Sequence, residues 1–223
     1  MKIKVTEPLP GVMLLKFKTQ YETCATFMRL QEFYESPFKE IRGKFFTLET
    51  FMDLYAKKQG NFTYTCDWGG FNVPGHVIGE FYQLFGSDLL MKEEILFDRI
   101  WPDDGTGNPT PPRGPHYVIA MYDDECLDHE LAHAMYYLDP EYKATADALV
   151  NGLDPDVRKA VTKWLLDTGY SKPQVPDEIN AYLSTDDKKS LSHHFGKEIG
   201  KLHKSLEPFR RAFLSQKKKR KLA

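Results

Sequence analysis

The sequence predicts an α+β fold, in which a small N-terminal region of strands and helices leads through an edge strand into a mainly helical C-terminal half. Three observations predict it. Runs of β-branched and aromatic residues that are typical of strands lie only before residue 123. From residue 125 onward, segments with helical spacing follow one another. The chain has 223 residues and is 41% hydrophobic, which is enough to bury a core.

The N-terminal region, residues 1–101, is expected to begin with two short strands, KIKV and VMLLKFK, around a Pro- and Gly-containing turn. Residues 21–35 have helical spacing and end before a Ser-Pro pair, which predicts a helix. A capping pattern that starts at Thr47 predicts a second helix, which ends at Gly60. The aromatic run FTYTCDW, residues 62–68, predicts a further strand.

Residues 102–115 contain five prolines and three glycines, a composition that excludes regular structure and predicts a long exposed loop. The run HYVIAMY, residues 116–122, follows and predicts the edge strand named above. Asp123 and Asp124 then supply an N-cap and favourable charge for a helix over residues 125–138.

The rest of the chain is predicted to be helical. The predicted helices cover residues 141–151 and 156–168, a segment that opens at Asp177, and residues 193–214. Residues 215–223 are expected to form a separate basic tail.

Charge is distributed unevenly along the chain. Residues 188–223 hold 12 Lys and Arg against 2 Asp and Glu, whereas residues 1–187 hold 18 against 30. The basic segment is therefore expected either to contact a polyanion or to fold back onto the acidic body. Its last part has the composition of a nucleic-acid or nuclear-import patch, and the residues concerned are Lys217, Lys218, Lys219, Arg220 and Lys221.

The three cysteines form no CxxC pair, and their odd number argues against a disulfide scaffold. No apolar run is long enough to cross a bilayer, and the N-terminus lacks the apolar core of a secretory signal. We therefore expect an intracellular, cytoplasmic protein without a membrane partner, or a nuclear one if the source is a eukaryote or a virus of one. The oligomeric state is not predicted.

One motif carries chemistry, the HExxH sequence from His129 to His133. Residues four apart lie on one face of a helix, so both imidazoles can point at one cation. Glu130, one residue after His129, leans toward the open coordination position, where it can take a proton from water.

A catalytic zinc needs a third protein ligand. The downstream candidates are Glu178, His193, His194 and His203. Glu178 is best placed, because it lies in the first turn of a new helix after two helices that can return the chain to the motif. The His193-His194 pair is the alternative, and an ordinary capping role for Glu178 also stays open.

These residues, together with the segment EINAY and the strand before the motif, resemble the gluzincin group of zinc metallopeptidases. The resemblance implies that residues 116–214 are a zincin-like metal-binding region, that His129, His133 and Glu178 bind one Zn²⁺ ion, and that Glu130 is the general base. It also implies a peptide substrate bound along the edge strand. Residues that could steady the oxyanion are Tyr182, His194 and His203.

The sequence thus predicts a zinc-dependent peptidase that acts on a peptide or protein with a metal-activated water. The alternative is a catalytically silent zincin-like binding module, associated with nucleic acid through its basic C-terminal segment. A di-iron carboxylate protein is disfavoured, because the chain has no second Glu-x-x-His pair.

Overall fold

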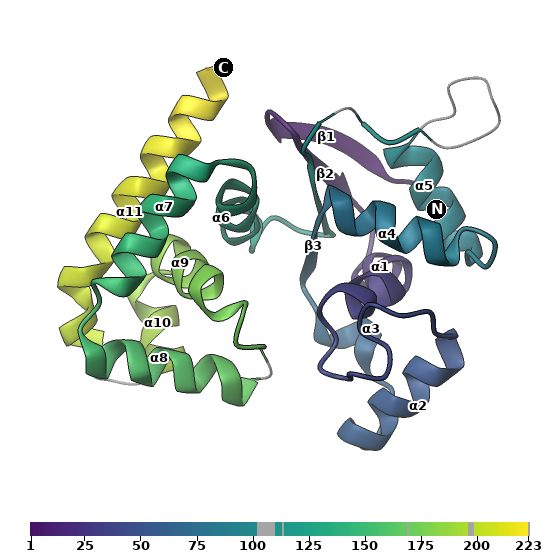
Figure 1. The fold of residues 1–223 in the computed structure, drawn as a ribbon, viewed down its shortest axis with the longest axis horizontal. Coiled ribbons are helices and arrows are strands. Elements are labelled where there is room, and N and C mark those ends of the chain that lie inside the picture. The colour runs from purple at the N-terminus through teal and green to yellow at the C-terminus, as the bar shows by residue number, and fades with distance from the viewer. Residues whose placement is uncertain (102–109, 113, 169, 196–198, 223) are drawn as a thin grey trace. The chain divides into compact units, whose positions relative to one another are not determined.

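The computed structural model divides into two compact units, Met1–Cys126 and Leu127–Ala223, and Figure 1 draws both. It describes residues 1–101, 110–112, 114–168, 170–195 and 199–222, without the side chains of residues 188 and 199–205. The first unit contains a four-stranded mixed sheet with helices, and the described part of the second is mainly helical, which confirms the predicted α+β class. Most of the predicted loop at 102–115 lies outside the described residues.

The sheet of the first unit has the order β1-β2-β4-β3. Its strands are β1 (Lys4–Leu9), β2 (Val12–Lys16), β3 (Gly70–Pro74) and β4 (Tyr117–Met121). Strand β2 runs antiparallel to β1 and parallel to β4, and β3 runs antiparallel to β4.

Strand β4 is therefore interior, and the prediction of an edge strand over residues 116–122 was wrong. All five of its residues are buried, and a continuous apolar run is the pattern of a strand covered on both faces. A peptide cannot add to a strand whose two edges are already paired, so substrate binding along this strand is not supported. Strand β4 lies in the first unit, Met1–Cys126, and the HExxH motif lies in the second.

Helices α1 (Gln20–Glu35) and α2 (Leu48–Gln59) agree with the sequence patterns. Thr19 and Thr47 are their N-caps, and each threonine hydroxyl accepts a hydrogen bond from a backbone N–H of the first turn. Helix α2 ends at Gly60, whose φ of 87° lies in the left-handed region that glycine adopts without strain.

The predicted strand over residues 62–68 was wrong, because Tyr64–Asp67 forms a single helical turn, α3. The Asp67 carboxylate accepts hydrogen bonds from the hydroxyls of Thr63 and Tyr55, which holds this turn against α2. Two further helices, α4 (Gly75–Phe85) and α5 (Met91–Ile100), were not predicted.

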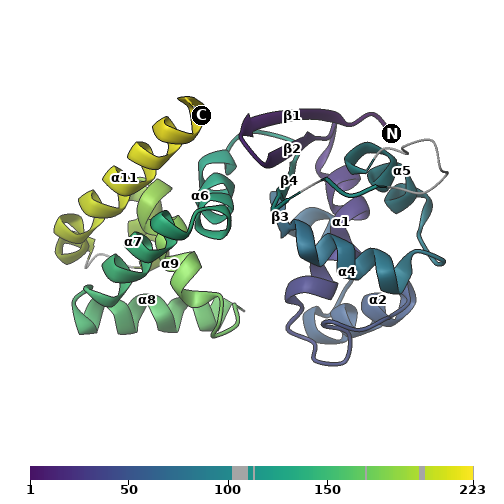
Figure 2. The same cartoon turned by 45° about the horizontal axis from the view of Figure 1, so that its top comes forward.

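The core of the first unit lies between one face of the sheet and its helices (Figure 2). Leu15, Phe71 and Val118 contribute from three neighbouring strands, and Phe27 of α1 and Phe81 of α4 pack in the same cluster. Each fully buried side chain of this size contributes about 1.5–3 kcal/mol to folding, so the sheet face and these helices form a firm scaffold.

The second unit is built from helices. They are α6 (Leu127–Leu138), α7 (Pro140–Asn151), α8 (Pro155–Thr168), α9 (Val175–Thr185), α10 (Lys188–Phe195) and α11 (Ile199–Leu222). The predicted helix over residues 193–214 is thus two helices, and the expected tail is helical as far as Leu222. Ile179 and Leu183 of α9 belong to one buried core cluster with Leu165 of α8 and Phe209 of α11. Within the described part of the chain, no helix has the length and apolar character that crossing a bilayer requires.

Candidate metal centre

Helix α6 places His129 and His133 one turn apart, with their ring centroids 4.9 Å apart and their planes at 77°. The opposite side of the helix is fixed in the core, where Leu131 and Met135 are buried. Because the apolar side is fixed, the two imidazoles are presented together on the other side, as the four-residue spacing predicts.

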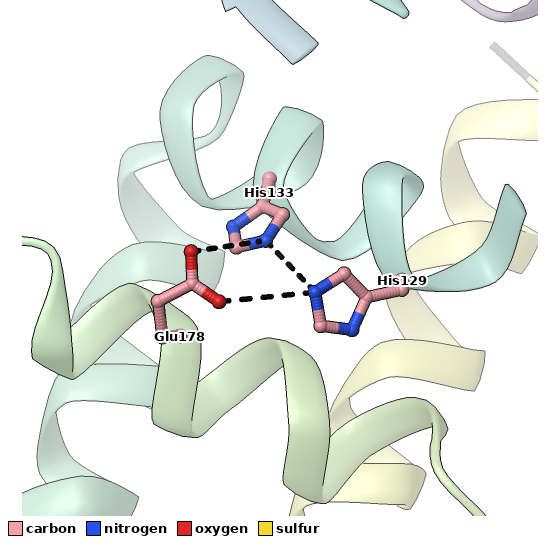
Figure 3. A group of neighbouring side chains, drawn as sticks. All are labelled: His129, His133 and Glu178. Atoms are coloured by element: carbon pink, nitrogen blue, oxygen red, sulfur yellow. Dashed lines mark hydrogen bonds and ion pairs between the residues drawn. The ribbon is translucent and has the colours of Figure 1, made fainter. Parts of the chain in front are cut away.

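Helix α9 brings the carboxylate of Glu178 to the two histidines (Figure 3). Pro176 lies in the first turn of α9, where a missing N–H costs nothing, and the Glu178 N–H donates to the carbonyl of Gln174 over 3.0 Å. Glu178 therefore begins the regular part of the helix with its side chain pointing at α6, and only 8% of the residue is exposed.

The three side chains converge on one point. The Nε2 atoms of His129 and His133 are 3.2 Å apart, and they lie 3.8 and 3.7 Å from the two Glu178 carboxylate oxygens. Tetrahedral zinc with bonds of about 2.0–2.1 Å keeps neighbouring ligand atoms about 3.3 Å apart, close to these values. In addition, Oε2 of Glu178 is buried and has no hydrogen-bond partner. The group could therefore hold a metal ion, whose charge would satisfy that oxygen.

Asp177 fixes the orientation of His133. Its Oδ2 accepts a hydrogen bond from Nδ1–H of His133 over 3.0 Å, which leaves Nε2 directed at the triad. A carboxylate on the far nitrogen is the usual support of a metal-binding imidazole. Burial acts to lower the pKa of His133, but the charges of Asp177 and Glu178 outweigh it and hold that pKa well above its usual range.

The two other ligand candidates are shifted toward their neutral forms. Burial, together with the charge of His133, lowers the pKa of His129 to about 4. Burial also raises the pKa of Glu178 to about 7 against the opposing effect of His133. Both shifts favour the uncharged forms of these groups, and a metal ion that binds imidazole and carboxylate ligands must displace any proton that they carry.

Glu130 is also buried, with 7% of the residue exposed. Its negative charge is one of the causes that raise the pKa values of Tyr170 and Tyr182, although burial is the largest cause for both. The carboxylate and these two phenols therefore lie within electrostatic range of one another beside the triad.

Of the three residues predicted to stabilise an oxyanion, Tyr182 lies beside the triad and His194 lies beside Tyr182. The Tyr182 ring packs against the His129 ring at a centroid distance of 4.7 Å, and the centroid of the His194 ring lies 5.5 Å from that of Tyr182. The side chain of His203 lies outside the described residues. As a third ligand, His194 is not brought to the triad, because its Nε2 instead pairs with Asp186 at 3.6 Å.

Sequence reasoning missed Tyr170, whose hydroxyl lies 3.2 Å from the hydroxyl of Tyr182. Trp164 was missed as well, and its ring packs against both Tyr182 and His194. The only local signal for Tyr170 was its place in the Pro-bounded segment before α9, the helix that carries Glu178.

The basic C-terminal segment contacts acidic residues of its own unit. Lys217 pairs with Asp128, Lys219 lies 3.8 Å from Glu141, and Arg220 lies 3.7 Å from Asp139. Of the two interpretations of the charge distribution, these contacts favour folding back onto the acidic body. Binding of nucleic acid by this segment stays a prediction.

Comparison of the chain with protein-family models, with curated proteins and with solved structures finds no match. The functional conclusion therefore depends on the geometry of the site.

Proposed function

We propose that this protein is a zinc-dependent peptidase of the gluzincin type, with His129, His133 and Glu178 as the metal ligands. The observation that supports it best is the convergence of two helical histidines with a buried carboxylate from a second helix. Two imidazole nitrogens and one carboxylate oxygen are a ligand set of hydrolytic zinc sites, which keep a fourth position open.

Bound zinc would supply a Lewis acid that polarises the scissile carbonyl and makes a nearby water more acidic. The residues of the chain handle the protons. Glu130, next to His129 on α6, accepts the proton of the attacking water and then passes it to the leaving amine. One proton is taken and one is returned, so the carboxylate ends each cycle as it began.

The hydroxyls of Tyr170 and Tyr182 are the donors we propose for the developing oxyanion. They form a pair 3.2 Å apart, and Tyr182 is already in contact with His129. Both phenols keep their protons at neutral pH, because burial raises the pKa of Tyr182 to about 12 and raises that of Tyr170 as well. A protonated hydroxyl fixed beside the reacting carbonyl stabilises its negative charge.

The proposal is tested by elemental analysis together with the variant Glu130→Gln, assayed on a library of peptides. We expect one zinc per chain in both proteins and hydrolysis by the wild type only, because an amide cannot take the proton. Iron in place of zinc would overturn the metal assignment, since the same ligand set also binds ferrous iron. Zinc without hydrolysis in the wild type would favour the silent binding module.

A further inference from the structure

Helix α11 contacts both helices that carry the proposed metal ligands. Its Leu206 and Phe209 are buried in the core cluster that also contains Ile179 and Leu183 of α9. Nearer its end, Phe213 is buried as well. In Figure 1 the helix runs along α7 and α9 within the second unit.

Polar side chains of α11 reach the ends of the same ligand helices. Arg210 donates to the backbone carbonyl of Asp186, the C-cap residue of α9. Lys217 pairs with Asp128, the residue before His129 in the first turn of α6. Together these contacts connect the end of one ligand helix with the beginning of the other.

A third contact lies at the other end of α6. Asp139 follows the last residue of α6 and is the N-cap of α7, where it accepts from two backbone N–H groups. The same carboxylate accepts from the Gln216 side chain and lies 3.7 Å from the Arg220 guanidinium. Gln216 is buried, and the Arg220 and Asp139 side chains are only 18% and 19% exposed, so water weakens this contact little.

We infer that the basic end of α11 is a clamp that holds α6 at both of its ends against α9, and thereby keeps His129 and His133 within reach of Glu178. The inference rests on the proposed metal binding. Lys217, Arg220 and Gln216 are positioning residues, since they act on the site through Asp128 and Asp139. The last turns of the chain then serve the metal centre, in addition to any contact that Lys218 and Lys221 make with a polyanion.

The direction in which zinc affinity changes when these cations are removed distinguishes a clamp from simple electrostatics. Lys217 and Arg220 are cations in the same unit as a site for a dication, so Coulomb's law alone predicts that removing them strengthens zinc binding. A clamp predicts the opposite, because loosened helices must be brought back into register when zinc binds.

The test compares Lys217→Met, Arg220→Met and the double variant with wild type in zinc competition against a chromophoric chelator. Lys218→Met and Lys221→Met are matched controls, because both lysines are exposed on the same helix and form none of the pairs above. We expect affinity to fall roughly threefold in Lys217→Met and roughly tenfold in the double variant, as pairs of this kind predict. The controls should stay within about twofold of wild type, and Lys217→Arg should restore binding.

Unchanged or tighter zinc binding in the double variant would overturn the clamp. If wild type itself binds no zinc, the proposed function fails. The clamp is then tested independently by amide hydrogen exchange of α6 in the metal-free protein. Faster exchange in the double variant than in the two controls would support it, and equal exchange would overturn it.

Discussion

Oδ2 of Asp177 lies 3.0 Å from Nδ1 of His133, and the neighbouring Glu178 points its carboxylate at Nε2 of the same imidazole. Two consecutive residues of α9 thus lie next to the two ring nitrogens of one histidine. Asp177 holds the ring and Glu178 shares its proposed metal, so a small rotation of α9 would disturb both contacts together.

Asp177→Asn is expected to weaken zinc binding about ten- to a hundredfold, the usual effect of losing a carboxylate that supports a metal-binding imidazole. The amide can donate its N–H to Nδ1 of His133, which places the proton of the neutral ring on Nε2, the nitrogen that would bind zinc. Calorimetric titration with zinc measures the change. Asp187→Asn, at an exposed position of the same unit, is the control and should bind as wild type does.

Glu178→Gln is expected to weaken zinc binding by at least about tenfold, because it replaces a charged ligand with a neutral one of the same shape. Zinc content after dialysis against a weak chelator measures the loss. Full retention of zinc would remove Glu178 from the ligand set.

Tyr170→Phe is expected to lower kcat roughly ten- to a hundredfold with little change in KM or in zinc content, because an oxyanion donor acts mainly in the transition state. The measurement is steady-state kinetics on any peptide that the wild type cleaves. Tyr137→Phe, a more exposed tyrosine of the same unit, is the control. A change in KM alone would assign Tyr170 to substrate binding instead.

The basic end of α11 also carries lysines that take no part in the proposed clamp. Lys218 and Lys221 are exposed, and we expect them to bind single-stranded nucleic acid weakly at low salt, because each neutralised phosphate releases a counterion. Fluorescence anisotropy with a labelled oligonucleotide at several salt concentrations measures this. If Lys218→Met together with Lys221→Met binds as wild type does, another surface is responsible.

A pH-dependent stability is expected in the first unit. Glu32 of α1 is buried, and burial raises the pKa of its carboxyl above the ordinary 4.5. The folded state therefore holds the proton more tightly than the unfolded state, so the free energy of unfolding falls as pH rises from about 4.5 through the raised pKa.

Glu32→Gln removes this titration. The free energy of unfolding of this variant should equal that of wild type near pH 4. At pH 7 it should be higher by about 1 kcal/mol or more, the usual cost of burying a charged carboxylate. Urea unfolding at both pH values measures the difference, with Glu40→Gln at an exposed position as control. A difference that is the same at both pH values would contradict this account.

The convergence of His129, His133 and Glu178 was predictable because its signals in the sequence are local. His129 and His133 lie on one predicted helix, and Glu178 begins another after a proline, so the search for a third ligand was confined to a few positions. The polar contacts of α11 were not predictable, since they join residues far apart in the chain, such as Lys217 and Asp128.

The fold class was predictable for the same reason, and the place of β4 in the sheet was not. A continuous apolar run identifies a strand but does not identify its partners, and β4 pairs with β2 from the beginning of the chain. A strand was predicted where the turn α3 forms, because aromatic residues at alternate positions are typical of a strand. In the structure the buried Tyr64 ring instead packs edge-on against Phe51 and Tyr55.

The interior position of β4 has a consequence for how the chain is made. Val12 of β2 pairs with Tyr117 of β4, so the parallel half of the sheet cannot form until the ribosome has delivered the whole first unit. Until then β3 lacks β4, its one partner among the described strands, and β2 presents a bare edge to any other growing chain. Closing so long a segment is slow compared with forming a hairpin. Nascent chains that stop short of residue 117 should therefore aggregate, whereas chains that extend past Met121 should not.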